Sequence, residues 1–296
     1  MTHLPGPRHG EILTDECNKA VVKDFRIAFA FTGISEIDKE RADYWLCRQL
    51  IAAHSNEGGD DLKRCLERIA NAATLGFARL RKDTGTLYRH AFVGAGWAYC
   101  GIGDPEQTVA ELCPIYLFVS NALNQQLRWT AAARDDFNWG WGFFRGKGLL
   151  HLSTAGQNVR ESQLKELRRN IVRLLRAGAG PQSAARLMVE AVREVARSYK
   201  SVGNDVMVSC VPRQAVANND TGLRVEFGPP NRQVSTFHFV SGKREVAYGP
   251  QYVHGNRFFG DWHIDAPAGI NPITGTINMT GGSVIFRTGL GDAPAL

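Results

Sequence analysis

The chain has 296 residues, a formal net charge of +6 at pH 7 and 44% hydrophobic residues. A chain of this size can bury a large core, and it contains no apolar run near the roughly 20 residues that a membrane helix needs. The first residues lack the apolar stretch of a secretory signal, so the sequence predicts a cytoplasmic protein that does not associate with a membrane.

The N-terminal part predicts two strands and two helices. A turn and a short strand are expected within residues 10–25, and the apolar run 26–31, which leads to Gly33, indicates a buried strand. Apolar side chains then recur with a helical period over about 36–54 and 60–81. The sequence therefore predicts a strand pair followed by a helix pair.

The middle of the chain is rich in glycine and aromatic residues. Residues 89–100 and 113–123 are predicted strands, 135–148 a loop with strand ends, and 149–157 a short strand. The glycines of 93–103 resemble a nucleotide-binding loop, but no helix opens after them. We therefore expect a strand with turns and close backbone packing there.

A second helix pair precedes a β-rich tail. Apolar stripes run through 164–175 and 184–195, and Pro181 is suited to a first helical position. Residues 205–212 predict a strand, and from 213 onward only strand-like segments are visible. Because strands and helices do not alternate one by one, we expect an α+β fold, a four-layer αββα sandwich, rather than a doubly wound parallel sheet.

Three further features have an ordinary structural explanation. Six cysteines without a C-x-x-C pair favour buried free thiols over disulfides or zinc ligands. The basic run 158–176 favours a solvated helix face, and we expect no nucleic-acid partner. His254, Asp261, His263 and Asp265 could bind a metal, but their composition is more typical of a surface loop. We expect no cofactor and no metal.

Lys19 and Gly33 flank the first predicted strand pair and could belong to a catalytic site. A lysine beside a nucleophile can activate it by its charge, and a backbone N–H at a strand-to-helix junction can stabilise an oxyanion. The residues alone favour a solvent-facing lysine and a turn glycine.

The segment "TDECNKAVVKDFRIAFAFTGISEID" resembles the proteasome-type N-terminal-nucleophile (Ntn) hydrolases, and more closely the bacterial proteasome-like proteins of unassigned function. The resemblance continues through the helix "DYWLCRQL" and through "FVGAGW", "PIYLFVSNAL", "HLSTAGQ" and "SVGNDVMVSCVP". It covers about residues 10–215 and implies the αββα sandwich over 1–215, without the first strand, and a β-rich extension over 216–296. These hydrolases attack a peptide or amide with the side chain of an N-terminal residue, usually Thr.

The resemblance also implies site residues. The family's lysine corresponds to Lys19, its oxyanion glycine to Gly33, and two serines to Ser201 and, more loosely, Ser153. The family aspartate corresponds to Ser198, which is a departure.

A larger departure lies at the front, where no strand carrying the nucleophile fits before Lys19. Either the true start lies further upstream, or the strand was lost. We favour a non-catalytic Ntn-like protein that acts through assembly, as a homo-oligomer, or through binding. The alternative is a threonine peptidase or amide hydrolase whose nucleophile lies upstream.

Overall fold

The computed structural model describes a defined part of the chain. Apart from single gaps, this part comprises residues 19–54, 62–102, 109–124, 128–144, 150–156, 159–199 and 208–211, together with short strands between 235 and 285. Within the stretches 150–156 and 251–285 only some residues are described. In the described residues, no helix is both long enough and apolar enough to span a membrane.

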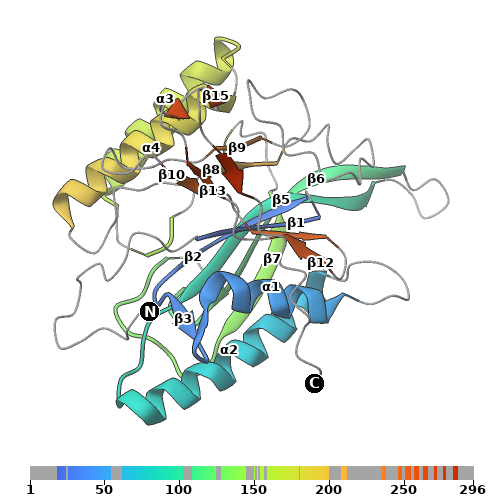
Figure 1. The fold of residues 1–296 in the computed structure, drawn as a ribbon. Coiled ribbons are helices and arrows are strands. Elements are labelled where there is room, and N and C mark those ends of the chain that lie inside the picture. Colours follow the sequence, from blue (N-terminus) through green and yellow to red (C-terminus); the bar gives the residue numbers. More distant parts are fainter. Residues whose placement is uncertain are drawn as a thin grey trace.

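A seven-stranded sheet forms the centre of the molecule (Figure 1). Its strand order is β12-β11-β1-β2-β5-β6-β7. The bounds are β1 Ala20–Lys23, β2 Ile27–Thr32, β5 Ala91–Ile102, β6 Val109–Ser120, β7 Asn138–Phe143, β11 Gln251–His254 and β12 Arg257–Phe259. Every pair is antiparallel except β1 with β11, which run parallel. Strands β11 and β12, from the C-terminal part of the chain, thus extend the sheet beyond β1.

Helices α1 (Ala42–Ala53) and α2 (Leu62–Thr84) cover one face of this sheet (Figure 1). Strand β2 alternates buried and less buried positions, so Phe29 and Phe31 point into the core while Ala30 is exposed. Trp45 of α1 stacks on Phe92 of β5, with 5.6 Å between ring centroids. The predicted α+β class and both predicted helices are confirmed, although α1 begins at Ala42 rather than 36.

The segment between β2 and α1 explains that later start. Strands β3 (Glu36–Ile37) and β4 (Glu40–Arg41) form a tight hairpin, with Asp38 and Lys39 at positive φ. Arg79 of α2 donates two hydrogen bonds to the Asp38 carboxylate, at 2.9 and 2.6 Å. The turn is therefore tied to the helix beneath it, and helical geometry can begin only after β4.

Helices α3 (Glu161–Arg176) and α4 (Pro181–Ser198) form a hairpin on the other side of the sheet from α1 and α2 (Figure 1). Pro181 occupies the first helical position, as predicted. Strand β8 (Val208–Cys210) contacts both α4 and β1, so it lies between the hairpin and the central sheet.

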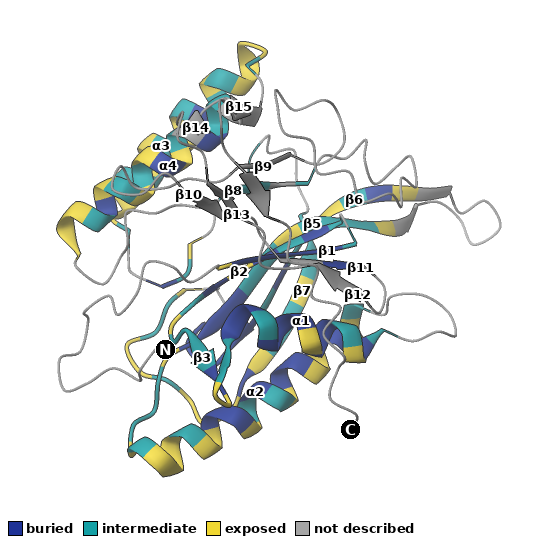
Figure 2. Ribbon diagram, in the orientation of Figure 1, coloured by how far each residue is buried: buried dark blue, intermediate teal, exposed yellow. Residues whose placement is uncertain are grey.

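The other short strands come from the C-terminal tail. Strand β9 (Ser235–Phe237) pairs with β8; β10 (Val246–Tyr248), β13 (His263–Asp265) and β16 (Ser283–Ile285) form a small sheet, and β14 (Ile270–Asn271) pairs with β15 (Thr276–Ile277). Figure 2 shows burial concentrated in the central sheet and in the inner faces of α1 and α2, whereas α3 and α4 are mostly exposed or intermediate.

The glycines of β5 have the packing role that the sequence predicts. A Cβ atom at Gly96 would collide with the backbone carbonyl of Arg26, and one at Gly94 would lie 2.9 Å from the carbonyl of Ala28. Because β2 and β5 pair along this stretch, the side chains are absent where the two backbones approach most closely.

Three expectations for the middle of the chain need correction. Residues 135–148 contain a regular strand, β7, which pairs with β6 because small glycines alternate with aromatic residues. The described residues of 149–157 are not strand, and Gly156 has a φ of +98° that interrupts extended backbone. Cys113, a half-buried residue of β6, is disulfide-bonded rather than a free thiol, because the fold brings its sulfur to that of another cysteine, which spacing along the chain does not indicate.

The structure also bears on two other cysteines and on the four residues that could bind a metal. Cys47 and Cys65 are buried free thiols, as predicted. His254 lies on β11, whereas His263 and Asp265 lie on β13 in another sheet, and Asp261 is outside the described residues. The described residues contain no cluster of three potential metal ligands.

Candidate functional site

The hairpin of β1 and β2 brings Lys19 and Gly33 to the same end of the sheet. The two strands pair from Ala20 opposite Ala30 to Lys23 opposite Ile27. Beyond them, the N–H of Phe31 donates to the Lys19 carbonyl at 3.2 Å. Lys19 therefore directly precedes β1, while Gly33 directly follows β2, so the thirteen residues between them form a closed hairpin.

Lys19 is an exposed lysine without an ion-pair partner among the described residues. It lies opposite Phe31, and opposite residues of an antiparallel pair point to the same face of the sheet. Within the described part of the chain, its ammonium group makes no hydrogen bond or ion pair. Lys23 at the other end of β1 is different, because it is buried and forms an ion pair with Asp24.

Gly33 is held against the strand beside it. Its φ is +117°, a conformation that side chains other than hydrogen rarely adopt. A Cβ atom there would lie 2.5 Å from the Arg89 carbonyl oxygen and 2.7 Å from Nδ1 of His90. Close packing alone thus requires glycine at this position. In the described residues its backbone N–H has no hydrogen-bond acceptor, so this donor is available to a ligand.

His90 is a residue of this site that the sequence analysis missed. It precedes β5 and is fully buried among four phenylalanine rings, with centroid distances from 4.6 Å (Phe92) to 6.4 Å (Phe137). Neither ring nitrogen has a hydrogen-bond partner among the described residues. Burial, and then the positive charge of Lys19, lower the pKa of His90 from 6.5 to about 3. His90 is therefore a neutral imidazole at physiological pH.

The backbone of His90 is fixed by two buried polar side chains. Its N–H donates to Oδ1 of Asn121 at 2.8 Å, and its carbonyl accepts a hydrogen bond from the Ser120 hydroxyl at 2.8 Å. The Asn121 amide also donates to the carbonyls of Tyr88 and Arg134. These bonds set the position of the residue against which Gly33 packs.

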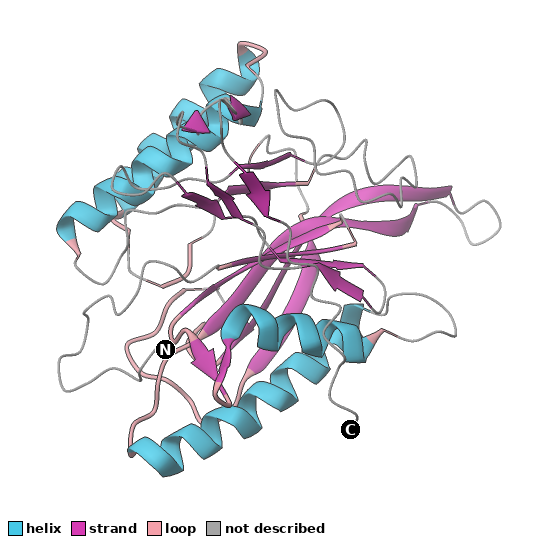
Figure 3. Ribbon diagram, viewed as in Figure 1, coloured by secondary structure: helices cyan, strands magenta, loops and turns pink. Residues whose placement is uncertain are grey.

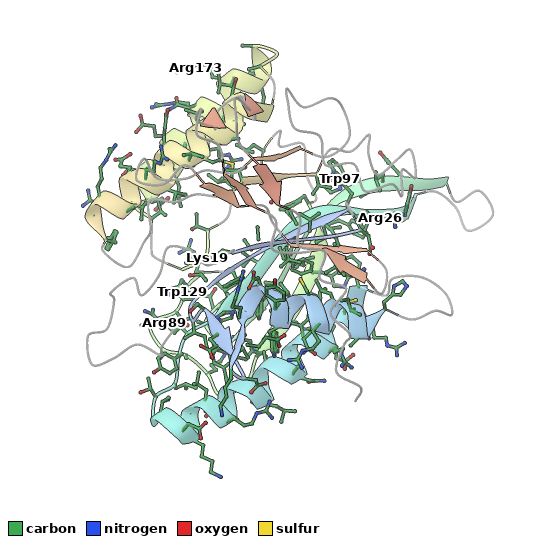
Figure 4. All side chains as sticks on the ribbon, viewed as in Figure 1. Lys19, Arg26, Arg89, Trp97, Trp129 and Arg173 are labelled. Carbon is green, nitrogen blue, oxygen red and sulfur yellow. The ribbon has the colours of Figure 1, made fainter. Side chains whose placement is uncertain are left out.

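Arg89, whose backbone carbonyl packs against Gly33, adds a second positive charge at this end of the sheet. Its guanidinium lies over the ring of Trp129, 5.5 Å from the centroid, and donates to the Thr130 carbonyl at 3.1 Å. Figure 4 shows Lys19, Arg89 and Trp129 toward the same end of the sheet. With two cations and one free backbone N–H, this end of the sheet can attract and stabilise a negatively charged group.

The structure does not place the remaining predicted site residues. Ser153 and Ser201 lie outside the described residues. Gly156 approaches the site, because a Cβ atom there would lie 2.5 Å from Oγ1 of Thr32. Ser198, which occupies the position of the family aspartate, is exposed at the end of α4.

No sequence signal identified His90. The segment "RHAFVGAGW" indicates a strand, and its histidine stands at the boundary of that strand. Its burial depends on β2, α2 and the residues before β7, which are distant from it in the sequence.

Comparisons with known proteins found no match to a protein-family model, to a curated protein sequence or to a solved structure.

Proposed function

We propose that this chain has the four-layer αββα sandwich of the proteasome-type Ntn hydrolases and that it acts through assembly or binding. The layers would be α1 with α2, the central sheet, the short strands that include β8, and α3 with α4. Figure 3 supports this order, since its helices form two groups on opposite sides of the strands. The contacts of β8 with both α4 and β1 support it as well.

The observation that carries the proposal is the meeting of Lys19 and Gly33 at one end of the sheet. The family resemblance implies an activating lysine and an oxyanion glycine separated by fourteen positions. Here the hairpin supplies that separation, the lysine has no ion-pair partner in the described residues, and the glycine has an unused N–H there. Both groups are thus available to a ligand.

Two features favour binding over catalysis. First, serine replaces the family aspartate at position 198, and it is exposed. Second, among the described residues the charge of Lys19 acts on the pKa of His90, a buried neutral group rather than a nucleophile. A lysine that activates a nucleophile must lie beside it. We therefore propose that the site holds a ligand or a segment of another copy of the chain.

The alternative is an Ntn-type amide hydrolase that cleaves a peptide or another amide. The unused N–H of Gly33 beside an unpaired ammonium favours it, because these groups could stabilise the oxyanion and activate the nucleophile. Its Thr, Ser or Cys nucleophile would lie outside the described residues.

Two measurements on the full chain test these proposals. Mass photometry should show a homo-oligomer, and a monomer at all accessible concentrations would contradict assembly. An electrophilic probe for N-terminal nucleophiles, read by intact mass, should leave the protein unlabelled. Labelling that disappears in Lys19→Ala, but persists in the control Lys39→Ala, would instead establish the hydrolase. Lys39 is an exposed lysine on the β3–β4 turn and is not one of the residues of the site described above.

A further inference from the structure

The outer face of α3 carries a basic surface that is separate from the site described above. A hollow of about 440 Å³ lies along this helix. The described residues that line it are Lys165, Arg168, Arg169, Val172, Arg173 and Arg176. They recur every three or four positions, so they share one helix face over three turns. We call this set the α3 basic face, and Figure 4 shows its Arg173 far from Lys19 and Arg89.

The arginines of the α3 basic face are unpaired. None of the four makes a hydrogen bond or ion pair in the described structure, and only Lys165 has a partner, Glu161, at 3.0 Å. Arginines near α1 and α2 behave differently: Arg41 pairs with Asp43, Arg48 with Glu40, and Arg79 with Asp38. Several arginines near α1 and α2 thus have a carboxylate partner, whereas the four arginines of the α3 basic face have none among the described residues.

The side chains of the α3 basic face favour some anionic partners over others. Guanidinium groups present planar forks that match phosphate oxygens, and here arginine outnumbers lysine by four to one. Val172 is the only apolar side chain among the described residues of the lining, so the face lacks the apolar stripe by which a helix enters a bilayer. Both features favour a phosphate backbone over a lipid surface.

We propose that the α3 basic face binds the sugar–phosphate backbone of a nucleic acid without reading its sequence. The sequence alone favours a solvated helix face; the hollow and the absence of partner carboxylates favour a ligand. The stretch from Lys165 to Arg176 is about 16 Å long at 1.5 Å per residue. Duplex DNA carries one negative charge per about 1.7 Å of its axis, counting both strands, so several phosphates lie along a face of this length.

The release of counterions from DNA determines how much each lost phosphate contact weakens binding. Each phosphate contact on duplex DNA contributes about 0.9 to the slope of log affinity against log salt, or roughly fivefold in affinity at physiological salt. The triple variant Arg168→Gln/Arg169→Gln/Arg173→Gln should therefore bind roughly 100-fold more weakly than the unmodified protein, and its slope should be smaller by about 2.7.

The experiment is fluorescence anisotropy with a labelled 20-base-pair duplex of arbitrary sequence (about two helical turns) at several salt concentrations. A matched control, Lys39→Gln/Arg68→Gln/Lys82→Gln, removes the same charge from exposed residues near α1 and α2 that make no hydrogen bond or ion pair with the described residues. We expect the control to keep the salt slope of the unmodified protein.

Three results would overturn the proposal. The first is the absence of binding by the unmodified protein at low salt. The second is an equal loss of affinity in both triple variants, because net charge alone would then explain it. The third is equal competition by poly-L-glutamate at matched charge, because the face would then have no preference for phosphate. A normal circular-dichroism spectrum of each variant establishes that it is folded.

Discussion

The burial of His90 makes the acid stability of the fold testable with one substitution. The pKa of His90 is about 3 in the folded protein, against an ordinary value of 6.5. Between these values the unfolded chain binds a proton that the folded chain does not. The free energy of unfolding therefore falls as the pH falls below about 6.5, and this loss is complete near pH 3.

Each unit of difference in pKa corresponds to about 1.4 kcal/mol, so His90 should lower the free energy of unfolding by about 3 kcal/mol between pH 7 and pH 4. His90→Phe removes the titrating group and keeps an aromatic ring among Phe31, Phe77, Phe92 and Phe137. At any one pH, His90→Phe removes two ring nitrogens that have no partner among the described residues, which raises the free energy of unfolding by about 1–3 kcal/mol. The larger phenylalanine ring lowers that free energy by a similar amount. The quantity to compare is therefore the change in the free energy of unfolding between pH values, rather than its value at one pH.

Urea unfolding followed by circular dichroism at pH 7, 5.5 and 4 measures this change. From pH 7 to pH 4, His90→Phe should lose about 3 kcal/mol less stability than the unmodified protein. Lys19→Met should lose an intermediate amount, because removal of the Lys19 charge raises the pKa of His90. Parallel pH profiles for His90→Phe and the unmodified protein would refute the argument, since His90 would then titrate alike in both states.

Three other substitutions or measurements test the packing around the site and the correction at Cys113. Gly33→Ala should lower the urea midpoint more than Gly85→Ala, because both glycines have positive φ but only Gly33 has backbone atoms where a Cβ would go; equal effects would show that φ alone matters. Asn121→Ala should lower the free energy of unfolding by about 3 kcal/mol, because it leaves the buried N–H of His90 and the partly buried carbonyls of Tyr88 and Arg134 without this partner, and a loss below about 1 kcal/mol would contradict this role. Alkylation of the denatured protein should add at least two more groups after reduction than before it, because Cys113 is disulfide-bonded, and an unchanged mass would disprove the bridge.

The sequence correctly predicted helices and strands whose formation depends mainly on neighbouring residues. Helix α2 has buried residues at helical spacing from Cys65 to Phe77, and β2 alternates burial along its length, so period alone located both. The hairpin that brings Lys19 and Gly33 to one end of the sheet is equally local. The residues alone favoured a solvent-facing lysine and a turn glycine, however, so their role in a site rests on the family resemblance and stays a prediction.

The features that the sequence could not predict depend on distant pairings. Strand β11, from the C-terminal part of the chain, pairs in parallel with β1, and nothing in its four residues indicates that β1 is its partner. The unpaired nitrogens of His90 result from rings contributed by four separate segments. The disulfide at Cys113 is a further case, because spacing along a chain does not specify which sulfurs meet in space.

The distribution of charge separates residues that maintain the fold from residues available for binding. Asp43 is buried and accepts hydrogen bonds from Arg41, and Asp38 holds the β3–β4 turn to Arg79, so loss of either carboxylate would disturb local structure. Lys19 and the α3 arginines are exposed and bonded to nothing in the described residues. Unpaired exposed charges contribute little to stability, since water solvates them equally in both states. Their substitution should therefore leave the fold intact, and a change in binding after it can be attributed to the lost contact.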